Sequence, residues 1–386
     1  MEKLVGAHAG DVQIITPDDG YHYFFGYYDM RATNADGKHL AHRVRFMDRL
    51  PTPTDVAELG TLKNGVFTPF ATTTAWNFQQ GAMLQWHPRR KDTVYYNVCE
   101  GGRFMTVTHD LATGEKTYTD RATACVSPCG KWGLAINFGR IYAFRPGYGY
   151  AGFTDEGADV AAPTQDGVFL TDMETGRSRL LISYEKLAPL AGFLPTDKIL
   201  VNHITFNPAS DRFLALVRRF DDGDATRPWG KCSVPMICDL NGNAHPACPP
   251  TYFSHYYWVS NTDFVAHCTV EAEKKSLYRI NTDSGEWQEY VLPDGHRDIH
   301  CILSPDGRYI IGDGYPKKEY RPLMAYSMQT GETRELFAAF SVTPPVTDIR
   351  CDLHVRFIDG GRAISFDTTH NGRRQIAVIL TNVLDF

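Results

Sequence analysis

The feature that most constrains the fold is a strand–turn–strand motif that returns along the whole 386-residue chain. Its clearest copy runs from Ile302 to Ile311 with the sequence ILSPDGRYII, in which Pro-Asp-Gly supplies the turn between two β-rich runs. Six further copies, of decreasing clarity, lie at 33–38, 126–131, 206–212, 357–362, 85–88 and 259–263. Several copies are followed by a second turn sequence, at 110–115, 172–177, 281–286 and 327–332. Each unit is therefore expected to contain four strands.

A four-stranded unit that recurs every ~40 to 50 residues is typical of a propeller, in which each blade buries its faces against its neighbours. We predict an all-β, seven-bladed β-propeller with four-stranded blades, folded as a single domain over residues 1–386. The blades are placed near 22–72, 82–119, 121–182, 202–248, 252–292, 298–338 and 351–384, and Val12 to Ile15 forms the strand that closes the ring. Two insertions are expected, one from Arg145 to Pro163 inside the third blade and one from Ser183 to Asp197 between blades.

Composition and charge narrow the range of partners. Hydrophobic residues make up 43% of the chain and charged residues 22%, which predicts a globular protein with a large core. The formal net charge of -6 leaves no basic surface for nucleic acid, so no nucleic-acid partner is expected. No apolar run approaches the ~20 residues of a membrane span, so we expect no membrane partner and a cytoplasmic location.

Histidines recur at one position of the motif. His300 lies five residues before Pro305, His203 lies five before Pro208, and His354 lies five before the aligned Asp359. His255 falls within one residue of the same register. Because the first strand of each blade runs beside the central channel, four neighbouring blades would present imidazole at one channel mouth. Imidazole is the commonest metal ligand, although any single histidine could equally be a core residue bonded to a carbonyl.

Other polar residues extend this candidate site. Asp352 is two residues from His354, so it points to the same side and is a fourth ligand or a partner that fixes a tautomer. Asp298 and Asp313 are weaker candidates. The predicted metal ligands are His255, His300, Asp352 and His354, and the predicted substrate-binding residues are Tyr28, Trp76, Asn77, Gln79, Gln80, Arg321 and Arg350. Trp76 could instead cover a seam between blades, and each arginine could be a solvated surface residue.

The repeats together with His300, Asp352 and His354 resemble the oligogalacturonate lyases, most clearly over residues 200 to 384. The resemblance implies a manganese ion held by histidines and a glutamine on one face of a seven-bladed propeller, and β-elimination with an arginine as base. It assigns His300 and His354 as ligands, His255 as a pocket histidine and Arg218 as the basic arginine. The chain departs from the family at Asp352, where a His-Pro-His run is expected. A carboxylate there hardens the site and repels a uronate, so zinc and calcium are alternatives to manganese.

We therefore predict a metal-dependent lyase that cleaves uronate-containing, anionic oligosaccharides by β-elimination. His203 is the first choice of base and Arg218 the second, while Tyr28 or Tyr315 would protonate the leaving oxygen. Two alternatives remain open. One is a propeller glycoside hydrolase or another sugar-active enzyme, and the other is a non-catalytic binding scaffold.

Overall fold

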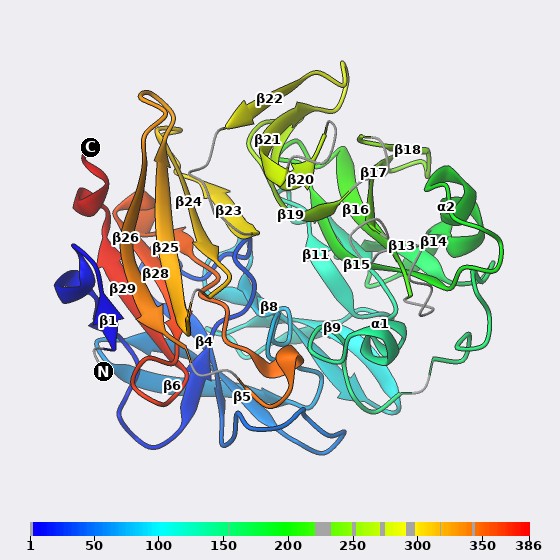
Figure 1. Ribbon diagram of the computed structural model, residues 1–386. Helices are drawn as coiled ribbons and strands as arrows, with labels where there is room; N and C mark the ends of the chain where they lie inside the picture. The colour runs from blue at the N-terminus through cyan, green and yellow to red at the C-terminus, as the bar shows by residue number, and fades with distance from the viewer. Residues whose placement is uncertain are drawn as a thin grey trace. The chain divides into compact units, whose positions relative to one another are not determined.

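The computed structural model describes residues 3–153, 155–220, 233–248, 252–270, 275–290, 298–316, 318–341 and 344–386. The strands in this part of the chain form seven antiparallel sheets, six with four strands and one with five. The fold is a seven-bladed β-propeller, as the repeat predicts (Figure 1). Its chain divides into two compact units. Unit 1 comprises Met1–Trp86, His255–Tyr257 and Val291–Phe386, and unit 2 comprises His87–Ser254 and Trp258–Tyr290.

The first four sheets follow the predicted blades in chain order. The first contains β3 (His22–Phe24), β4 (His39–Val44), β5 (Ala57–Lys63) and β6 (Val66–Thr73). The second contains β7 (Gln85–Trp86), β8 (Thr93–Glu100), β9 (Arg103–Asp110) and β10 (Lys116–Tyr118). The third contains β11 (Thr123–Val126), β12 (Trp132–Ala135), β13 (Gly167–Asp172) and β14 (Ser178–Ser183). The fourth contains β15 (Ile199–Phe206), β16 (Arg212–Arg219), β17 (Ser233–Asp239) and β18 (Ala244–Pro246).

The last three sheets include two strands from the N-terminus. The fifth contains β19 (Phe253–Trp258), β20 (Asp263–Thr269), β21 (Lys275–Asn281) and β22 (Trp287–Tyr290). The sixth contains β23 (Ile299–Leu303), β24 (Tyr309–Gly314), β25 (Tyr320–Ser327), β26 (Thr333–Phe340) and β1 (Leu4–Val5). The seventh contains β27 (Arg356–Ile358), β28 (Ala363–Thr368), β29 (Gln375–Leu380) and β2 (Gln13–Ile14). The pairing of β2 with β29 confirms the predicted closing strand, whereas the pairing of β1 with β26 was not predicted.

Turn chemistry explains why the repeat folds into hairpins. Between β23 and β24, the Gly307 N–H donates to the carbonyl of Ser304, and the Ser304 hydroxyl donates to Asp306 (2.6 Å). Gly307 has a φ of +74°, which glycine adopts without a steric penalty. In the second kind of turn, Asp110 accepts hydrogen bonds from the backbone N–H groups two and three residues later. Both predicted turn types are therefore present.

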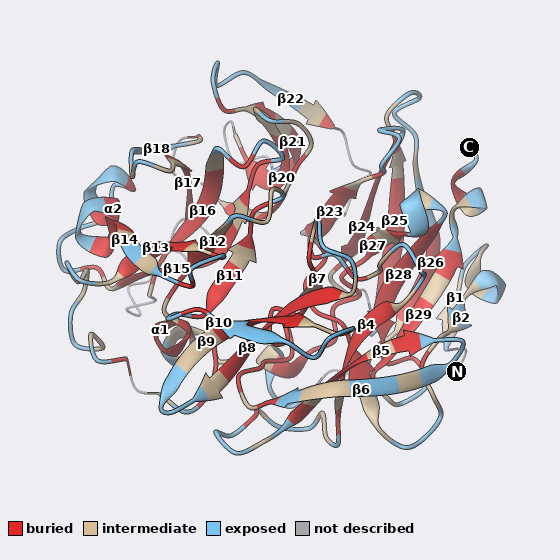
Figure 2. Cartoon of the chain, turned by 180° about the vertical axis from the view of Figure 1, so that it is seen from behind, coloured by how far each residue is buried: buried red, intermediate tan, exposed pale blue. Residues whose placement is uncertain are grey.

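Burial follows strand order within a sheet. All six residues of β24 and of β28 are buried, whereas all three residues of β10, the last strand of its sheet, are exposed (Figure 2). In unit 1, a continuous apolar core joins β24, β25, β26, β28 and β29, with Ile311, Leu323, Phe337 and Phe366 among its members. Strands that carry the candidate site are thus held by a large apolar core.

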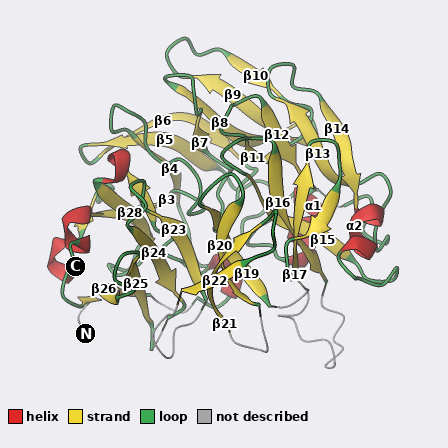
Figure 3. Ribbon diagram, turned by 90° about the horizontal axis from the view of Figure 1, so that it is seen from above, coloured by secondary structure: helices red, strands yellow, loops and turns green. Residues whose placement is uncertain are grey.

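The two α-helices in the described residues are short (Figure 3). Helix α1 (Phe138–Phe144), which was not predicted, ends just before the first predicted insertion, and α2 (Tyr184–Leu190) lies within the second. The N-cap Ser183 of α2 accepts from the Lys186 N–H. Among the described residues, the 3₁₀ turns are η1 (Ala9–Asp11), η3 (Thr347–Ile349), η4 (Asp359–Gly361) and η5 (Thr381–Leu384). No helix in the described residues is long and apolar enough to cross a lipid bilayer.

Two histidines of β4 predict acid sensitivity. Burial lowers the pKa of His39 to about 3 and that of His42 to about 3. Both are therefore neutral in the folded state, so unfolding takes up protons below the usual histidine pKa of about 6.5. The contribution of the two neutral histidines to stability is fully present above about pH 6.5 and is lost as the pH falls toward 3. Between pH 7 and 5, each histidine should reduce the free energy of unfolding by about 2 kcal/mol.

Urea unfolding of two histidine variants tests this expectation. His42→Gln should reduce the pH-dependent loss of stability by about 2 kcal/mol between pH 7 and 5. The control is His245→Gln, at an exposed position of β18, which should leave that loss unchanged. An identical pH dependence in the two variants would contradict the expectation.

Candidate metal centre

His300 is fixed by a carboxylate on the neighbouring strand. Asp313 of β24 lies directly opposite His300 of β23, and its Oδ1 is 2.9 Å from His300 Nδ1. Because Asp313 accepts a hydrogen bond from Nδ1, the other ring nitrogen of the neutral imidazole keeps its lone pair. Nε2 is buried and has no hydrogen-bond partner in the described residues. The hairpin therefore presents a buried nitrogen that can act as a ligand.

The Asp313 carboxylate also positions His354. Asp313 Oδ2 accepts hydrogen bonds from the backbone N–H groups of Leu353 (2.7 Å) and His354 (3.2 Å). His354 has a φ of +44°, in the left-handed region that costs a non-glycine residue roughly 1–3 kcal/mol. Its side chain is fully buried, and among described residues neither ring nitrogen has a hydrogen-bond partner. The surrounding structure thus holds a strained histidine whose ring nitrogens make no hydrogen bond.

Asp352 is a buried carboxylate between two arginines. Arg321 Nη1 is 2.7 Å from Oδ1, and Arg350 Nε is 2.8 Å from Oδ2. Burial alone would raise the pKa of Asp352, but Arg321 and Arg350 hold it well below its usual range. Asp352 is therefore ionised at neutral pH.

His300, Asp352 and His354 form a group that could hold a metal ion. One potential ligand atom from each lies within 4.8 Å of the other two. Two imidazole nitrogens and one carboxylate oxygen match the ligand preferences of zinc and manganese, and three protein ligands leave coordination positions open. The orphaned Nε2 of His300 and the orphaned ring nitrogens of His354 fit such an ion.

The two ligand histidines have opposite pKa shifts. Burial alone would lower the pKa of His300, but Asp313, Asp352 and Asp298 together raise it. Burial and the neighbouring His300 lower the pKa of His354 well below its usual value. His354 is therefore neutral at pH 7, which is the form that binds a metal.

His255 lies beside this group. Its Nδ1 is 2.9 Å from Asp298 Oδ1, and its ring centre is 3.9 Å from that of His300. The ring centres of His300 and His354 are 4.6 Å apart. Three of the four predicted histidines are thus brought together. The three-residue group does not include His255, so its role as a ligand stays a prediction.

Aromatic side chains surround the histidines. Tyr27 makes edge contacts with His300 (5.6 Å) and His354 (4.8 Å). The Tyr28 hydroxyl donates to the Tyr256 carbonyl (2.7 Å) and accepts from the Tyr256 N–H, and the side chain is fully buried. Burial raises the pKa of Tyr28 well above its usual value. These contacts give Tyr28 a structural role, and its predicted role in protonating or binding substrate stays a prediction.

Tyr315 contacts both arginines of the site. The guanidinium carbons of Arg321 and Arg350 each lie 5.7 Å from the centre of its ring. The side chains of both arginines are nearly buried, at 5% and 6% exposure, which corrects the alternative of solvated surface residues. The predicted proton donor and the predicted anion-binding residues therefore lie together.

The loop from 74 to 81 has a structural role. The Trp76 ring is fully buried against Phe24, Phe46 and Phe78, and its N–H donates to the Asp55 carbonyl (2.8 Å). No face of the Trp76 ring is exposed, and its predicted role in binding substrate stays a prediction.

The amides of this loop are also buried. Asn77 Oδ1 accepts from the backbone N–H groups of Gln79 and Gln80, and forms a tight turn. Gln79 Nε2 donates to the carbonyls of Asp348 (3.1 Å) and Arg350 (2.9 Å). The side chains of Asn77 and Gln79 thus stabilise backbone, and Gln79 positions the segment that leads to Asp352. The predicted contacts of Asn77, Gln79 and Gln80 with substrate stay predictions.

His203 and Arg218 belong to unit 2. His203 is a buried residue at an irregularity of β15, where the pairing with β16 shifts. The Arg218 guanidinium donates to Asn202 Oδ1 (2.8 Å) and Ser233 Oγ (2.7 Å). Their roles as bases stay predictions.

The fold and these side chains define a class: a seven-bladed β-propeller with a buried His/Asp group that is a candidate metal centre. No family model matches the sequence, and no curated protein matches it. Among solved structures, the chain is similar to an oligogalacturonate lyase in complex with manganese, with a TM-score of 0.66 and 14% identity over 97% of this chain and 94% of that one. An oligogalacturonate lyase from Vibrio parahaemolyticus gives a TM-score of 0.66 and 14% identity, over 96% and 93%. At this identity the likeness shows the fold.

Proposed function

We propose that the protein is a metal-dependent lyase that cleaves uronate-containing oligosaccharides by β-elimination. The observation that carries the proposal is the buried group of His300, Asp352 and His354 with two arginines on its carboxylate. The similarity to an oligogalacturonate lyase that binds manganese supports the same class of reaction and makes manganese the first metal to test.

Charge balance supports an anionic substrate. The ion-paired side chains of the site are Arg321, Arg350, Asp298, Asp313 and Asp352. Two positive and three negative formal charges leave one negative charge among these side chains when the histidines are neutral. The buried Arg356 and Arg374, which share Asp367, add one positive charge near His354. A divalent cation would add two further positive charges, which favours an anionic substrate. The negative charge that Asp352 adds is thus offset by its two arginines.

The reaction breaks a C–H bond next to the carboxylate, forms a C=C bond, and breaks the C–O bond to the leaving sugar. A bound divalent cation would stabilise the negative charge that develops on the carboxylate. Arg321 and Arg350 would orient this carboxylate through their N–H groups. The predicted bases His203 and Arg218 belong to unit 2, so within unit 1 we propose His255 as the base, in place of its predicted role as a ligand. Asp298 fixes its ring, and it lies outside the three-residue ligand group. Tyr315, against both arginines, would protonate the leaving oxygen.

The test measures the unsaturated product. Protein stripped with EDTA and reconstituted with Mn²⁺ should raise the ultraviolet absorbance of a digalacturonate or trigalacturonate solution, and the stripped protein should not. His300→Gln and His354→Gln should abolish the rise. His245→Gln is the matched control at an exposed histidine and should retain it.

Three results would contradict the proposal. A flat absorbance trace with Mn²⁺, Zn²⁺ and Ca²⁺ on these substrates would exclude β-elimination of oligogalacturonides. New reducing ends without new absorbance would indicate hydrolysis instead. Equal activity of the stripped and reconstituted proteins would separate the reaction from the candidate metal centre.

A further inference from the structure

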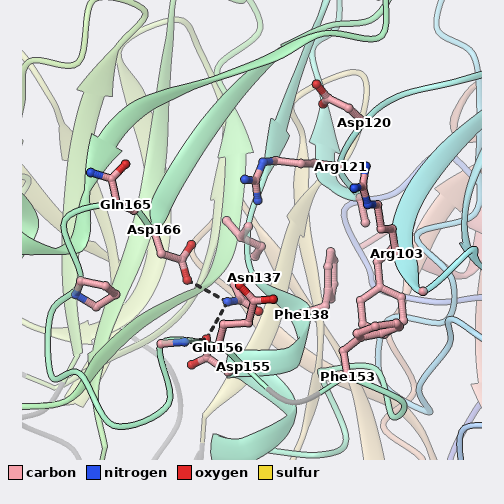
Figure 4. A pocket seen from close by; sticks show the side chains of 16 residues that line it. Arg103, Asp120, Arg121, Asn137, Phe138, Phe153, Asp155, Glu156, Gln165 and Asp166 are labelled. Carbon is pink, nitrogen blue, oxygen red and sulfur yellow. Dashed lines mark hydrogen bonds between the residues drawn. The ribbon is translucent and has the colours of Figure 1, made fainter.

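A cavity of about 750 Å³ lies in unit 2 at the insertion between β12 and β13. This volume falls within the roughly 300–1,000 Å³ of small-molecule sites. Figure 4 shows Arg103 and Arg121 on one side of the cavity and Asp155, Glu156 and Asp166 on the other. None of its residues belongs to the candidate metal centre. Asp120 also lines the cavity on the arginine side, so one wall carries two guanidinium groups and a carboxylate, and the other carries carboxylates without an arginine.

The basic wall carries the guanidinium groups of Arg103 and Arg121. The side chains of Arg103 and Arg121 form no ion pair or hydrogen bond with residues that the structure describes. The Arg121 guanidinium lies 3.7 Å from the centre of the Phe169 ring, which holds it in place. Asp120, the nearest carboxylate in sequence, instead accepts hydrogen bonds from Ser178. This wall is suited to an anionic group of a ligand.

The opposite wall offers carboxylate acceptors. Asn137 Nδ2 donates to Asp155 Oδ1 (3.0 Å) and to Asp166 Oδ2 (2.7 Å). Asp155 is neutralised by the buried Arg140 (2.9 Å), whereas Asp166 forms no ion pair with described residues. Burial raises the pKa of Asp166 because water solvates it poorly. Its remaining lone pairs can accept hydrogen bonds from hydroxyl groups.

The cavity is built on a fixed loop. Arg140 is fully buried and donates to the carbonyls of Gly157 (3.0 Å), Val160 (3.0 Å) and Ala161 (2.8 Å). A Cβ atom at Gly149 would lie 2.1 Å from the backbone nitrogen of Tyr142, so only glycine fits there. The insertion is therefore held against α1, and the wall that it provides exists before any ligand binds.

Aromatic rings form the apolar part of the lining. Phe104 and Phe153 meet edge to face with ring centres 5.1 Å apart, and Phe153 is half-buried. Phe138 also lines the cavity and stacks on Tyr150 at 4.2 Å. Such rings can contact the C–H face of a pyranose, while the polar walls bind its substituents.

We propose that this cavity is a second binding site, for a sugar acid of the hexuronate class. The carboxylate of the sugar would bind Arg103 and Arg121, its hydroxyls would bind Asp166 and Gln165, and its apolar face would contact Phe153. A carboxylate fits the planar donor groups of two arginines, and vicinal hydroxyls fit a carboxylate acceptor. The site goes beyond the proposed lyase reaction, because it would bind sugar without the metal centre.

Calorimetric titration of the full-length protein in EDTA tests this inference. Galacturonate and glucuronate should bind saturably, whereas galactose, glucose and inorganic phosphate should bind at least about tenfold more weakly, since each lacks one half of the recognised chemistry. Arg121→Gln and Asp166→Asn should each weaken uronate binding by about tenfold or more. Arg177→Gln, at an exposed arginine outside the lining, is the control and should bind like the wild type.

Three outcomes would overturn the inference: no saturable uronate binding, equal binding of galactose or phosphate, or an Arg121→Gln variant with unchanged affinity. Thermal unfolding of each variant confirms that it is folded. The result is separable from the lyase assay. A protein that binds uronates in this pattern without producing unsaturated sugar would refute the proposed function and leave this site standing.

Discussion

Replacing Asp313 with asparagine is expected to weaken Mn²⁺ binding by about 10- to 100-fold. The Asp313 carboxylate accepts from the ring of His300 through one oxygen and from the backbone of Leu353 and His354 through the other. An amide can offer N–H to His300 Nδ1, which moves the ring proton to Nε2 and removes the lone pair that would bind the metal. Asp313 is therefore a positioning residue for both histidines.

Calorimetry with Mn²⁺ and the stripped protein measures this effect. The control is Asp298→Asn, which changes the carboxylate that holds His255 and leaves the three-residue group intact. It should weaken binding much less. Equal losses in the two variants would contradict the role of Asp313, as would an unchanged affinity in Asp313→Asn. Manganese electron paramagnetic resonance gives an independent count of bound ion.

Replacing Asp352 with asparagine is expected to lower the free energy of unfolding by about 3–5 kcal/mol. The change leaves Arg321 and Arg350 buried beside a neutral amide, and an uncompensated buried charge is costly. The control is Glu332→Gln, which breaks the exposed ion pair between Glu332 and Arg334. That change should cost at most about 1 kcal/mol.

Urea unfolding at pH 7 compares the two variants. The double variant Asp352→Asn/Arg321→Gln should recover part of the loss, because only one unpaired guanidinium remains. If Asp352→Asn does not fold, the free energy of unfolding of the double variant is measured in its place. A loss in Asp352→Asn no larger than that in Glu332→Gln would show that the buried pair contributes little to stability.

The seven sheets and their order could be predicted because turn chemistry is local. Gly307 and the side chain of Asp110 specify their turns through contacts within a few residues. Strand β1, which is the fifth strand of the sixth sheet, was not predicted. It consists of two residues that pair with β26, more than 300 positions away. Nothing in a two-residue segment predicts which sheet edge it will meet.

The imidazoles of His255, His300 and His354 were predicted to meet because strand register places equivalent residues at equivalent points of each blade. The role of Asp313 could have been found from the same hairpin, since it pairs directly with His300 across the turn. Trp76 and Tyr28 were predicted to bind substrate. Their burial could not be predicted from the sequence, because it depends on contacts with residues far along the chain. The ring of Trp76 meets Phe24, and the hydroxyl of Tyr28 meets the backbone of Tyr256, 228 residues away.

The backbone of His354 provides a marker for other chains of this fold. At a φ of +44°, glycine and asparagine are the residues with the least steric cost, and histidine costs more than either. If the imidazole binds a metal, selection keeps the histidine in chains that bind it, while the backbone shape persists in chains that do not. We therefore expect glycine or asparagine to replace histidine at this position in propellers of this architecture that bind no metal here.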